Sequence, residues 1–223
     1  MARDAPMIHE ALAVGPFQCN CHILADPATK EAVIVDPGDD AGEILARVRD
    51  LGVTVKALVH THCHLDHIVA TRRLREETGA RILIHEADQW LYENLKMQIG
   101  ATLKLFGVRL GEADDPLPVD EFLRDGHRVT FGAHALQAIH TPGHTPGSCC
   151  FLLEHPAGRA CFSGDTLFAG SIGRTDLWGG DAEQELASIR ARLFTLDGET
   201  VVYPGHGPET MIREEKKYNP FLQ

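Results

Sequence analysis

The segment from His60 to His67 is the part of the chain whose residue types and spacing are best suited to chemistry. It reads His-Thr-His-Cys-His-Leu-Asp-His and places three imidazoles and one carboxylate within six residues, at His62, His64, Asp66 and His67. Neutral imidazole and ionised carboxylate are ligands of zinc, iron and manganese, and a hydrophobic core has little other use for so many of them together. We therefore predict a metal site here.

Three later residues of ligand type follow strand-like segments on glycine-rich turns. His144 lies in Thr-Pro-Gly-His-Thr-Pro-Gly, Asp165 in Ser-Gly-Asp-Thr and His206 in Tyr-Pro-Gly-His-Gly. Glycine lets the backbone turn tightly and approach a bound ion closely. Seven candidates exceed the four positions of one tetrahedral ion, so they suit two ions that share one carboxylate. The predicted division gives His62, His64 and His144 to one metal, Asp66, His67 and His206 to the other, and Asp165 to both.

The elements that position these residues alternate between strand and helix, which predicts a layered α/β fold. A buried strand at 55–59 precedes the first cluster and a helix at 68–78 follows it, so the cluster lies at a strand-to-helix turn. Further strands are predicted at 8–14, 19–25, 32–35, 81–85, 128–131, 134–140, 148–153, 159–163 and 200–203, and further helices at 42–51, 86–98, 182–194 and 208–216. Residues 100–118 lack periodicity and are predicted to form a connector or lid. Two sheets packed face to face, with helices outside, would bury this pattern.

Composition narrows the classes of partner. The 223 residues carry a net charge of −11 with histidine neutral, and only the short segment from Arg213 to Lys217 is rich in basic residues. An acidic chain is repelled on average by a phosphate backbone or an anionic membrane, so we expect neither nucleic acid nor membrane as a partner. No run of ~18 apolar residues occurs, and the first residues do not resemble a secretory signal. We therefore expect a cytoplasmic protein.

Other reactive residues near the motifs are interpreted as structural. Six cysteines are too sparse for a disulfide scaffold, and Cys19, Cys21 and Cys63 are interpreted as buried thiols rather than ligands. His60 is interpreted as a structural or orienting residue behind the metal ligands. Arg174 and Asp176 are predicted to form a buried ion pair or to brace the loop beside the site.

The ligand motifs resemble, in order and residue type, those of the metallo-β-lactamase-fold superfamily. The match covers nearly the whole chain and includes Asp-Pro-Gly at 36–38, Gly-Arg-Thr-Asp at 173–176 and Asn-Pro-Phe at 219–221. Those details resemble the short, single-domain branch of the glyoxalase II (hydroxyacylglutathione hydrolase) family. The resemblance implies one domain over residues 1–223, an αβ/βα four-layer sandwich of two mixed sheets with helices outside, and the same division of the seven ligands.

A dinuclear site of this kind predicts a hydrolase. Two divalent ions, zinc by preference with iron or manganese as alternatives, lower the pKa of a bridging water and make hydroxide available as the nucleophile. A thioester suits such a site because its leaving thiolate, with a pKa near ~8.5, needs no dedicated general acid. Asp66 is predicted to be catalytic by orienting the hydroxide. We therefore predict a thioester hydrolase that acts on small molecules of the S-acylglutathione type.

Three other functions are compatible with parts of the pattern. Persulfide dioxygenases share the fold and are expected to use a single iron held by the equivalents of His62, His64 and either Asp165 or His144. A nuclease or phosphodiesterase of the same fold is disfavoured by the acidic charge. A purely structural role is disfavoured because structural zinc sites are usually closed by four protein ligands. Retention of His206, which completes a second set of ligands, favours the hydrolase.

Overall fold

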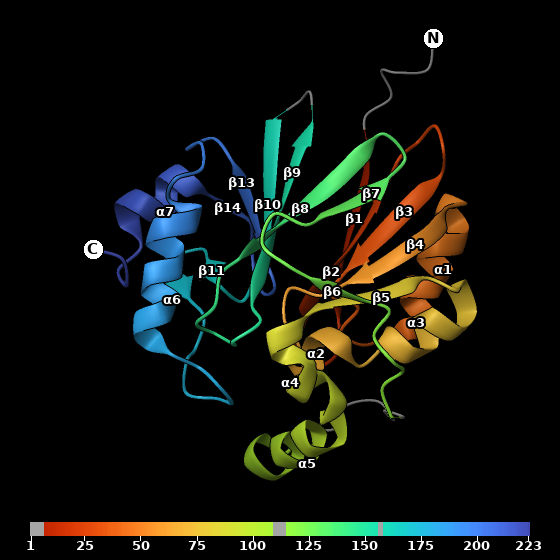
Figure 1. Cartoon of the computed structure of the whole chain (residues 1–223), viewed down its shortest axis with the longest axis horizontal. Helices are drawn as coiled ribbons and strands as arrows, with labels where there is room; N and C mark the ends of the chain where they lie inside the picture. The colour runs from red at the N-terminus through yellow and green to blue at the C-terminus, as the bar shows by residue number, and fades with distance from the viewer. Residues whose placement is uncertain (1–6, 109–114, 156–157) are drawn as a thin grey trace.

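Two mixed six-stranded sheets face each other in the computed structural model, which describes residues 7–108, 115–155 and 158–223 (Figure 1). The first sheet has the order β1 (Ile8–Val14), β2 (Cys19–Ala25), β3 (Glu31–Val35), β4 (Thr54–Val59), β5 (Arg81–His85) and β6 (Glu121–Leu123). The second has the order β14 (Thr210–Met211), β13 (Val201–Pro204), β10 (Gly158–Gly164), β9 (Cys149–His155), β8 (His134–His140) and β7 (Arg128–Phe131). The two-residue strands β11 (Leu167–Phe168) and β12 (Ser171–Ile172) form a small ribbon.

Helices lie on the outer side of each sheet (Figure 1). The first sheet is accompanied by α1 (Ala41–Leu51), α2 (Leu65–Ile68), α3 (Thr71–Thr78), the 3₁₀ turn η1 (Glu86–Asp88), α4 (Gln89–Glu93) and α5 (Leu95–Phe106). The second is accompanied by α6 (Ala182–Ser188), the π-type turn η2 (Ile189–Leu193) and α7 (Ile212–Tyr218). In the part of the chain that the structure describes, no helix combines the length and apolar character that a bilayer crossing requires.

Three hydrophobic clusters separate these layers, and β3 shows why. Its side chains alternate, so Val33 and Val35 join the cluster between the two sheets while Ile34 joins the cluster beneath the helices of the first sheet. Phe151 and Phe162 complete the central cluster from the second sheet. A third cluster joins the second sheet to η2 and α7. Burial on both faces explains the nearly continuous apolar sequence of the strands and confirms the predicted four-layer α/β sandwich.

All the predicted strands form, but several predicted helices were wrong in their extent. The helix predicted at 68–78 begins earlier, at Leu65, and breaks after Ile68 before α3 begins at Thr71. The break arises because the Ala70 N–H donates to the carbonyl of Pro37. The metal motif therefore runs into α2, which carries Asp66 and His67.

The region after β5 also differs from the prediction. The helix predicted at 86–98 is divided into η1, α4 and α5, and α5 continues through residues 100–106, which were predicted to be an irregular connector. Residues 109–114 of that predicted connector lie outside the described residues. In the second half, α6 gives way to the π-type turn η2 before residue 194, and the helix predicted at 208–216 begins only at 212, after β14. The short strands β6, β11, β12 and β14 were not predicted.

Candidate metal centre

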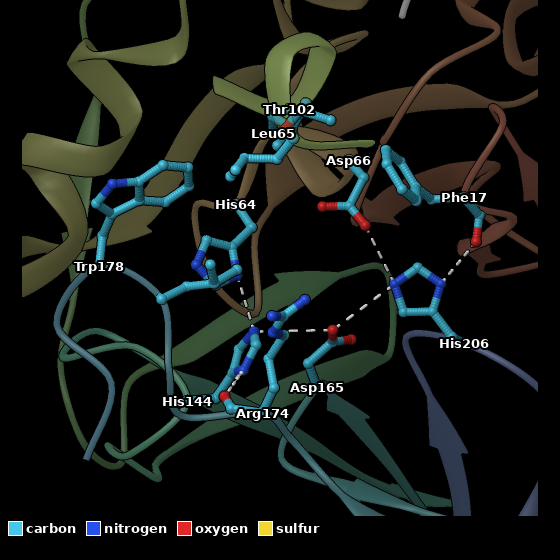
Figure 2. A pocket seen from close by; sticks show the side chains of 12 residues that line it. Phe17, His64, Leu65, Asp66, Thr102, His144, Asp165, Arg174, Trp178 and His206 are labelled. Atoms are coloured by element: carbon cyan, nitrogen blue, oxygen red, sulfur yellow. Dashed lines mark hydrogen bonds and ion pairs between the residues drawn. The ribbon is translucent and has the colours of Figure 1, made fainter. Parts of the chain in front are cut away.

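The seven predicted ligands meet at one edge of the sandwich, where several strands end. His62 and His64 follow β4, and the next residues form α2. His144 follows β8, Asp165 follows β10 and His206 follows β13. Figure 2 shows five of the seven side chains turned toward one another from these separate loops: His64, Asp66, His144, Asp165 and His206. The fold therefore brings together residues that lie up to 144 positions apart in the sequence, from His62 to His206.

The first set, the three-histidine group, consists of His62, His64 and His144. The Nε2 atom of His144 lies 3.1 Å from His62 Nε2 and 2.8 Å from His64 Nδ1. All three side chains are buried. Their nitrogens lie close enough together to share one ion.

The second set, the mixed group, consists of Asp66, His67 and His206. His206 Nε2 lies 3.2 Å from Asp66 Oδ2 and 3.3 Å from His67 Nε2. The third separation, between His67 Nε2 and Asp66 Oδ2, is 3.9 Å. These three atoms also cluster around a single point.

Asp165 lies between the two groups. Its Oδ1 atom is 3.4 Å from His67 Nε2, and its Oδ2 atom is 3.7 Å from His144 Nε2 and 3.6 Å from His206 Nε2. Oδ1 is buried and has no hydrogen-bond partner among the described residues. A buried acceptor without a donor is costly, and a bound cation would satisfy it.

The outward hydrogen bonds show which ring nitrogens carry protons. His144 Nδ1 donates to the carbonyl of Arg174 at 2.7 Å, and His206 Nδ1 donates to the carbonyl of Phe17 at 3.0 Å. A carbonyl can only accept, so the Nδ1 proton of each ring points away from the centre, and Nε2 faces it. In the neutral form of each ring, Nε2 carries a lone pair and is the atom that a metal binds. The arrangement of the donor atoms therefore fits a bound metal.

Asp36 supports both groups from behind. Its Oδ2 lies 3.1 Å from His67 Nδ1 and accepts a 2.7 Å hydrogen bond from the Thr61 hydroxyl. Because that hydroxyl donates to Asp36, its oxygen is available to accept from His62 Nδ1 at 3.1 Å. Asp36 adopts a positive φ of 51°, a conformation that Asp tolerates better than most residues. The sequence marked this position only as part of an Asp-Pro-Gly turn.

Without a metal, the two groups differ in their affinity for protons. Burial, together with the neighbouring histidines, lowers the pKa of His62 well below its ordinary value and that of His64 to about 3. Burial also acts to lower the pKa of His67, but Cys19 and the surrounding carboxylates raise it well above the ordinary value. The pKa of His206 is raised against the effect of burial by its contact with Asp66 and by Asp165. The mixed group thus attracts positive charge more strongly.

A model of the metallo-beta-lactamase superfamily matches residues 14–206 of this chain. The chain belongs to this superfamily. The hydroxyacylglutathione hydrolase GloC of Haemophilus influenzae is 38% identical over 214 residues, which are 96% of this chain and 97% of that protein. The mitochondrial persulfide dioxygenase ETHE1 of Bos taurus is 32% identical over 93% of this chain and 73% of its own length. Members of the superfamily are metal-dependent hydrolases or related enzymes.

Two solved structures show the same metallo-β-lactamase fold. The B3 metallo-beta-lactamase BLEG-1 has a TM-score of 0.85 and 36% identity, covering 97% of this chain and 100% of its own. The protein TTHA1623 in a di-iron-bound form has a TM-score of 0.83 and 38% identity, covering 96% and 100%. Together with the His/Asp clusters, the di-iron-bound neighbour supports a dinuclear metal site in this member of the superfamily. The domain boundaries 1–223, the preference for zinc and the cytoplasmic location stay predictions.

Two buried acids that the sequence analysis missed hold the ligand loops of this metallo-β-lactamase-fold chain. Asp88 accepts hydrogen bonds from Cys63 N at 2.9 Å, the Thr145 hydroxyl at 2.8 Å and Gly147 N at 2.6 Å, so it ties the loop of His62 and His64 to that of His144. Glu185 accepts from the backbone N–H of His144 at 2.9 Å. The residues that donate to these two acids lie tens of positions away from them along the chain, and no local sequence signal marks either acid.

The glycines beside the ligands are needed for close packing. A Cβ atom at Gly205 would overlap Asp165 Oδ1, and one at Gly38 would overlap the carbonyl oxygen of Asp66. Asn20 holds the His206 loop from below by donating to the carbonyls of Pro204 and Gly207, both at 2.9 Å. The predicted role of glycine at the His206 turn is thus explained by the space the ligands occupy.

The cysteines, His60 and the Arg174–Asp176 pair were all interpreted as structural. The three cysteines named above are buried free thiols, as predicted, although Cys19 Sγ lies 3.5 Å from His67 Nδ1. His60 bonds the Leu83 carbonyl at 3.1 Å and the Thr71 hydroxyl at 2.8 Å, which is a structural role. The prediction that Arg174 and Asp176 form a buried ion pair was wrong about burial. Arg174 and Asp176 do pair, at 2.7 Å, but their side chains are 49% and 69% exposed because they lie on a surface loop.

A cavity of about 300 Å³ opens over both groups. Figure 2 shows Trp178 beside His64 at one end and Phe17 beside His206 at the other. Apart from candidate ligands, the lining consists of Phe17, Leu65, Thr102, Leu105, Arg174, Leu177 and Trp178. A substrate that entered here would reach the candidate metal ligands along a mostly apolar wall.

Proposed function

We propose that this protein is a dinuclear metal-dependent thioester hydrolase, similar in activity to glyoxalase II, with S-acylglutathione-type thioesters as substrates. In this proposal the two metal ions are held by His62, His64 and His144, by Asp66, His67 and His206, and by Asp165 between them. The observation that carries it is the position of Asp165, whose carboxylate faces two complete sets of three donor atoms. The 38% identity to the hydroxyacylglutathione hydrolase GloC supports the choice of substrate.

Two divalent ions bound here would supply hydroxide at neutral pH and polarise the carbonyl of the substrate. The residues of the chain orient the reactants around them. Asp66 lines the cavity with its Oδ2 atom against His206, and its carboxylate is the group that would hold the proton of the attacking oxygen in the productive direction. Burial acts to raise the pKa of Asp66, but His67 and the contact with His206 lower it, so the carboxylate stays an ionised acceptor.

The cavity also accounts for the leaving group. Apart from the candidate ligands, Arg174 is the one titratable side chain among the described lining residues, and a guanidinium does not give up its proton. In such a reaction hydroxide would add to the carbonyl carbon and the C–S bond would break. The sulfur would leave as a thiolate with the electron pair of that bond, and the acyl group would be released as a carboxylic acid. A thiolate with a pKa near ~8.5 needs no proton donor at that moment, whereas an amine leaving from an ordinary amide does. This favours thioesters over amides.

A second candidate is a mononuclear iron persulfide dioxygenase, which the 32% identity to bovine ETHE1 favours. Such an enzyme would need one occupied group. The mixed group, however, offers a full set of three donor atoms that lie between 3.2 and 3.9 Å from one another. This complete second set supports the hydrolase.

The test loads the purified protein with zinc, iron or manganese and quantifies bound metal before each assay. Substrates are S-lactoylglutathione and other acyl-thioesters, followed by release of free thiol, with a chromogenic cephalosporin and a persulfide as competing substrates. Thioester turnover at about two ions per chain supports the proposal. Absence of turnover of every thioester at that occupancy contradicts it, and persulfide-dependent O₂ uptake at one iron per chain supports the dioxygenase. His62→Ala, checked by a melting curve, separates loss of chemistry from loss of fold.

A further inference from the structure

The cavity above the metal centre is apolar on the side of the three-histidine group. Trp178 packs near His64 (Figure 2), with 6.2 Å between ring centroids. Leu177 and Leu105 line the same cavity. Thr102 is the uncharged polar residue of the lining. Cavities of this composition bind the apolar part of a ligand and leave a few polar groups to orient it.

The one cation beside the cavity is already neutralised. The guanidinium of Arg174 makes two parallel hydrogen bonds to the Asp176 carboxylate, at 2.7 and 2.9 Å. Such a bidentate pair uses the fork that would otherwise recognise a carboxylate of the substrate. Among the described lining residues, no other Lys or Arg is present. The protein therefore offers little for an anionic acyl group in this part of the cavity.

The rim of the cavity exposes apolar side-chain surface to water, which is unfavourable in free energy. Leu105 on α5 is 66% exposed while also lining the cavity. Trp178 is shared with a neighbouring depression that Trp90 and Pro146 line. Covering Leu105 and the face of Trp178 with an apolar chain would remove this area from water.

From the apolar lining and the paired Arg174 we propose that the site selects thioesters with an apolar acyl group. The acyl chain binds against Trp178 with Leu177 and Leu105, which line the same cavity and are together called the wall. The inference rests on the proposed thioester hydrolase and deepens it by naming the class of acyl group. The thiolate side of the substrate would then lie toward the other end of the cavity, where Phe17 lines it beside His206. Small hydroxylated acyl groups, such as lactoyl, would fill this wall poorly.

The first experiment varies the acyl group on one carrier. Metal-loaded protein is assayed with S-acetyl-, S-butanoyl-, S-hexanoyl- and S-lactoylglutathione. We expect kcat/KM to rise by about fourfold for each methylene that the wall covers, with lactoyl near the bottom of the series. A series in which lactoyl is turned over as well as hexanoyl overturns the proposal.

Variants assign the preference to the wall. Trp178→Ala should flatten the rise of kcat/KM with chain length, and Trp178→Phe should retain most of it because an aromatic face remains. Trp90→Ala is the matched control, since this residue is 55% exposed and lines only the neighbouring depression. It should leave the slope unchanged. An unchanged slope in Trp178→Ala, or an equal loss in Trp90→Ala, overturns the assignment.

A binding measurement separates this inference from the proposed reaction. The chain has two tryptophans, so Trp90→Phe leaves Trp178 as the sole indole fluorophore. S-Hexylglutathione, a thioether that cannot be hydrolysed, should bind at least about tenfold more tightly than S-methylglutathione and shift the Trp178 emission to shorter wavelength. Tight hexyl binding without turnover of any thioester would overturn the reaction but support the wall. Turnover with equal affinity for both thioethers would overturn the wall and keep the reaction.

Discussion

The three-histidine group and the mixed group differ in what lies behind their donor atoms. Behind the first, His144 is held by the backbone carbonyl of Arg174 and His62 by the hydroxyl of Thr61, while the outer nitrogen of His64 has no partner among the described residues. Behind the second, the outer nitrogen of His67 faces the buried carboxylate of Asp36. The outer nitrogen of His206 is held by the neutral carbonyl of Phe17. Only the mixed group thus has a histidine, His67, whose outer nitrogen contacts a charged group directly.

Because of this difference, a single cluster of side chains contains two candidate metal-binding groups with different electrostatic surroundings. A carboxylate behind an imidazole strengthens it as a ligand and favours positive charge at its other nitrogen. The same environment raises the pKa of His67 against the effect of burial, while burial and neighbouring histidines lower the pKa of His62. We therefore expect the two groups to bind metal with different affinities and different sensitivity to mutation.

Asp165→Asn should have the largest effect because it removes the charge that both groups share. We expect thioester hydrolysis to fall by more than the ~10–100-fold typical of an outer hydrogen-bonding partner, with loss of bound metal. Metal content and thioesterase rate are measured together, with Asp50→Asn on the exposed face of α1 as the control. Two tightly bound ions and full activity in Asp165→Asn would remove the basis for a shared ligand.

Asp36→Asn should separate the two groups. It keeps the backbone conformation, since Asn also tolerates positive φ, but weakens the charge behind His67. We expect affinity for one of the two ions to fall by ~10–100-fold and the other to change less, because His62 is reached only through Thr61. Stepwise metal titration measures both, and Thr61→Val tests the relay alone. An equal loss of affinity for both ions would contradict the expected difference between the two groups.

Asp88→Asn should act on the three-histidine group through its loops. The amide presents one oxygen and one NH₂ to three donors, so at least one buried donor loses its partner. We expect the free energy of unfolding to fall by about 1–3 kcal/mol. Chemical denaturation of the metal-free protein measures it, with Glu86→Gln on the same turn as an exposed control. If Asp88→Asn weakened metal binding in the mixed group alone, the result would contradict the role that the contacts of Asp88 indicate.

Glu185→Gln should change how the stability of the protein depends on pH. Burial raises the pKa of Glu185 from 4.5 to about 9, so the folded protein binds a proton that the unfolded chain releases. Stability from this group is therefore present below about pH 4.5 and is lost as the pH rises toward 9. The melting temperature of metal-free Glu185→Gln should gain on the wild type between pH 5 and 9. The exposed Glu183→Gln should show no such gain, and a parallel pH dependence of Glu185→Gln and wild type would refute the assignment.

The strands were predictable because their signal is local. In β3 four apolar residues follow Glu31 without interruption, and the turn residues Asp36 and Pro37 come directly after them. The break between α2 and α3 was not predictable, because it depends on the Ala70 N–H finding the Pro37 carbonyl, a partner 33 residues earlier. The helical extent of 100–106 was missed because glycine at 100 suggested a loop, whereas α5 continues through it.

The same holds for the candidate site, where local motifs were predictable and long-range contacts were not. The seven ligand-type residues were identified in advance because each lies in a motif whose residue types have few other uses. Asp36, Asp88 and Glu185 were not, because a single acid in a sequence resembles any surface acid until its partners are known. Asp88 receives hydrogen bonds from residues 25, 57 and 59 positions away, distances over which sequence carries no pairing signal.

The chemistry available to this protein could be read from the order of its residues: five imidazoles and two carboxylates close to the ends of predicted strands, enough donors for two ions. These are properties of single residues and of short-range patterns. The three-dimensional structure was needed to show that Asp165 lies between two groups, that a carboxylate contacts the outer nitrogen of His67 directly, and that Trp178 and Leu105 line the cavity. Distances between side chains depend on how the two sheets pack, which is set by contacts between residues far apart in the chain.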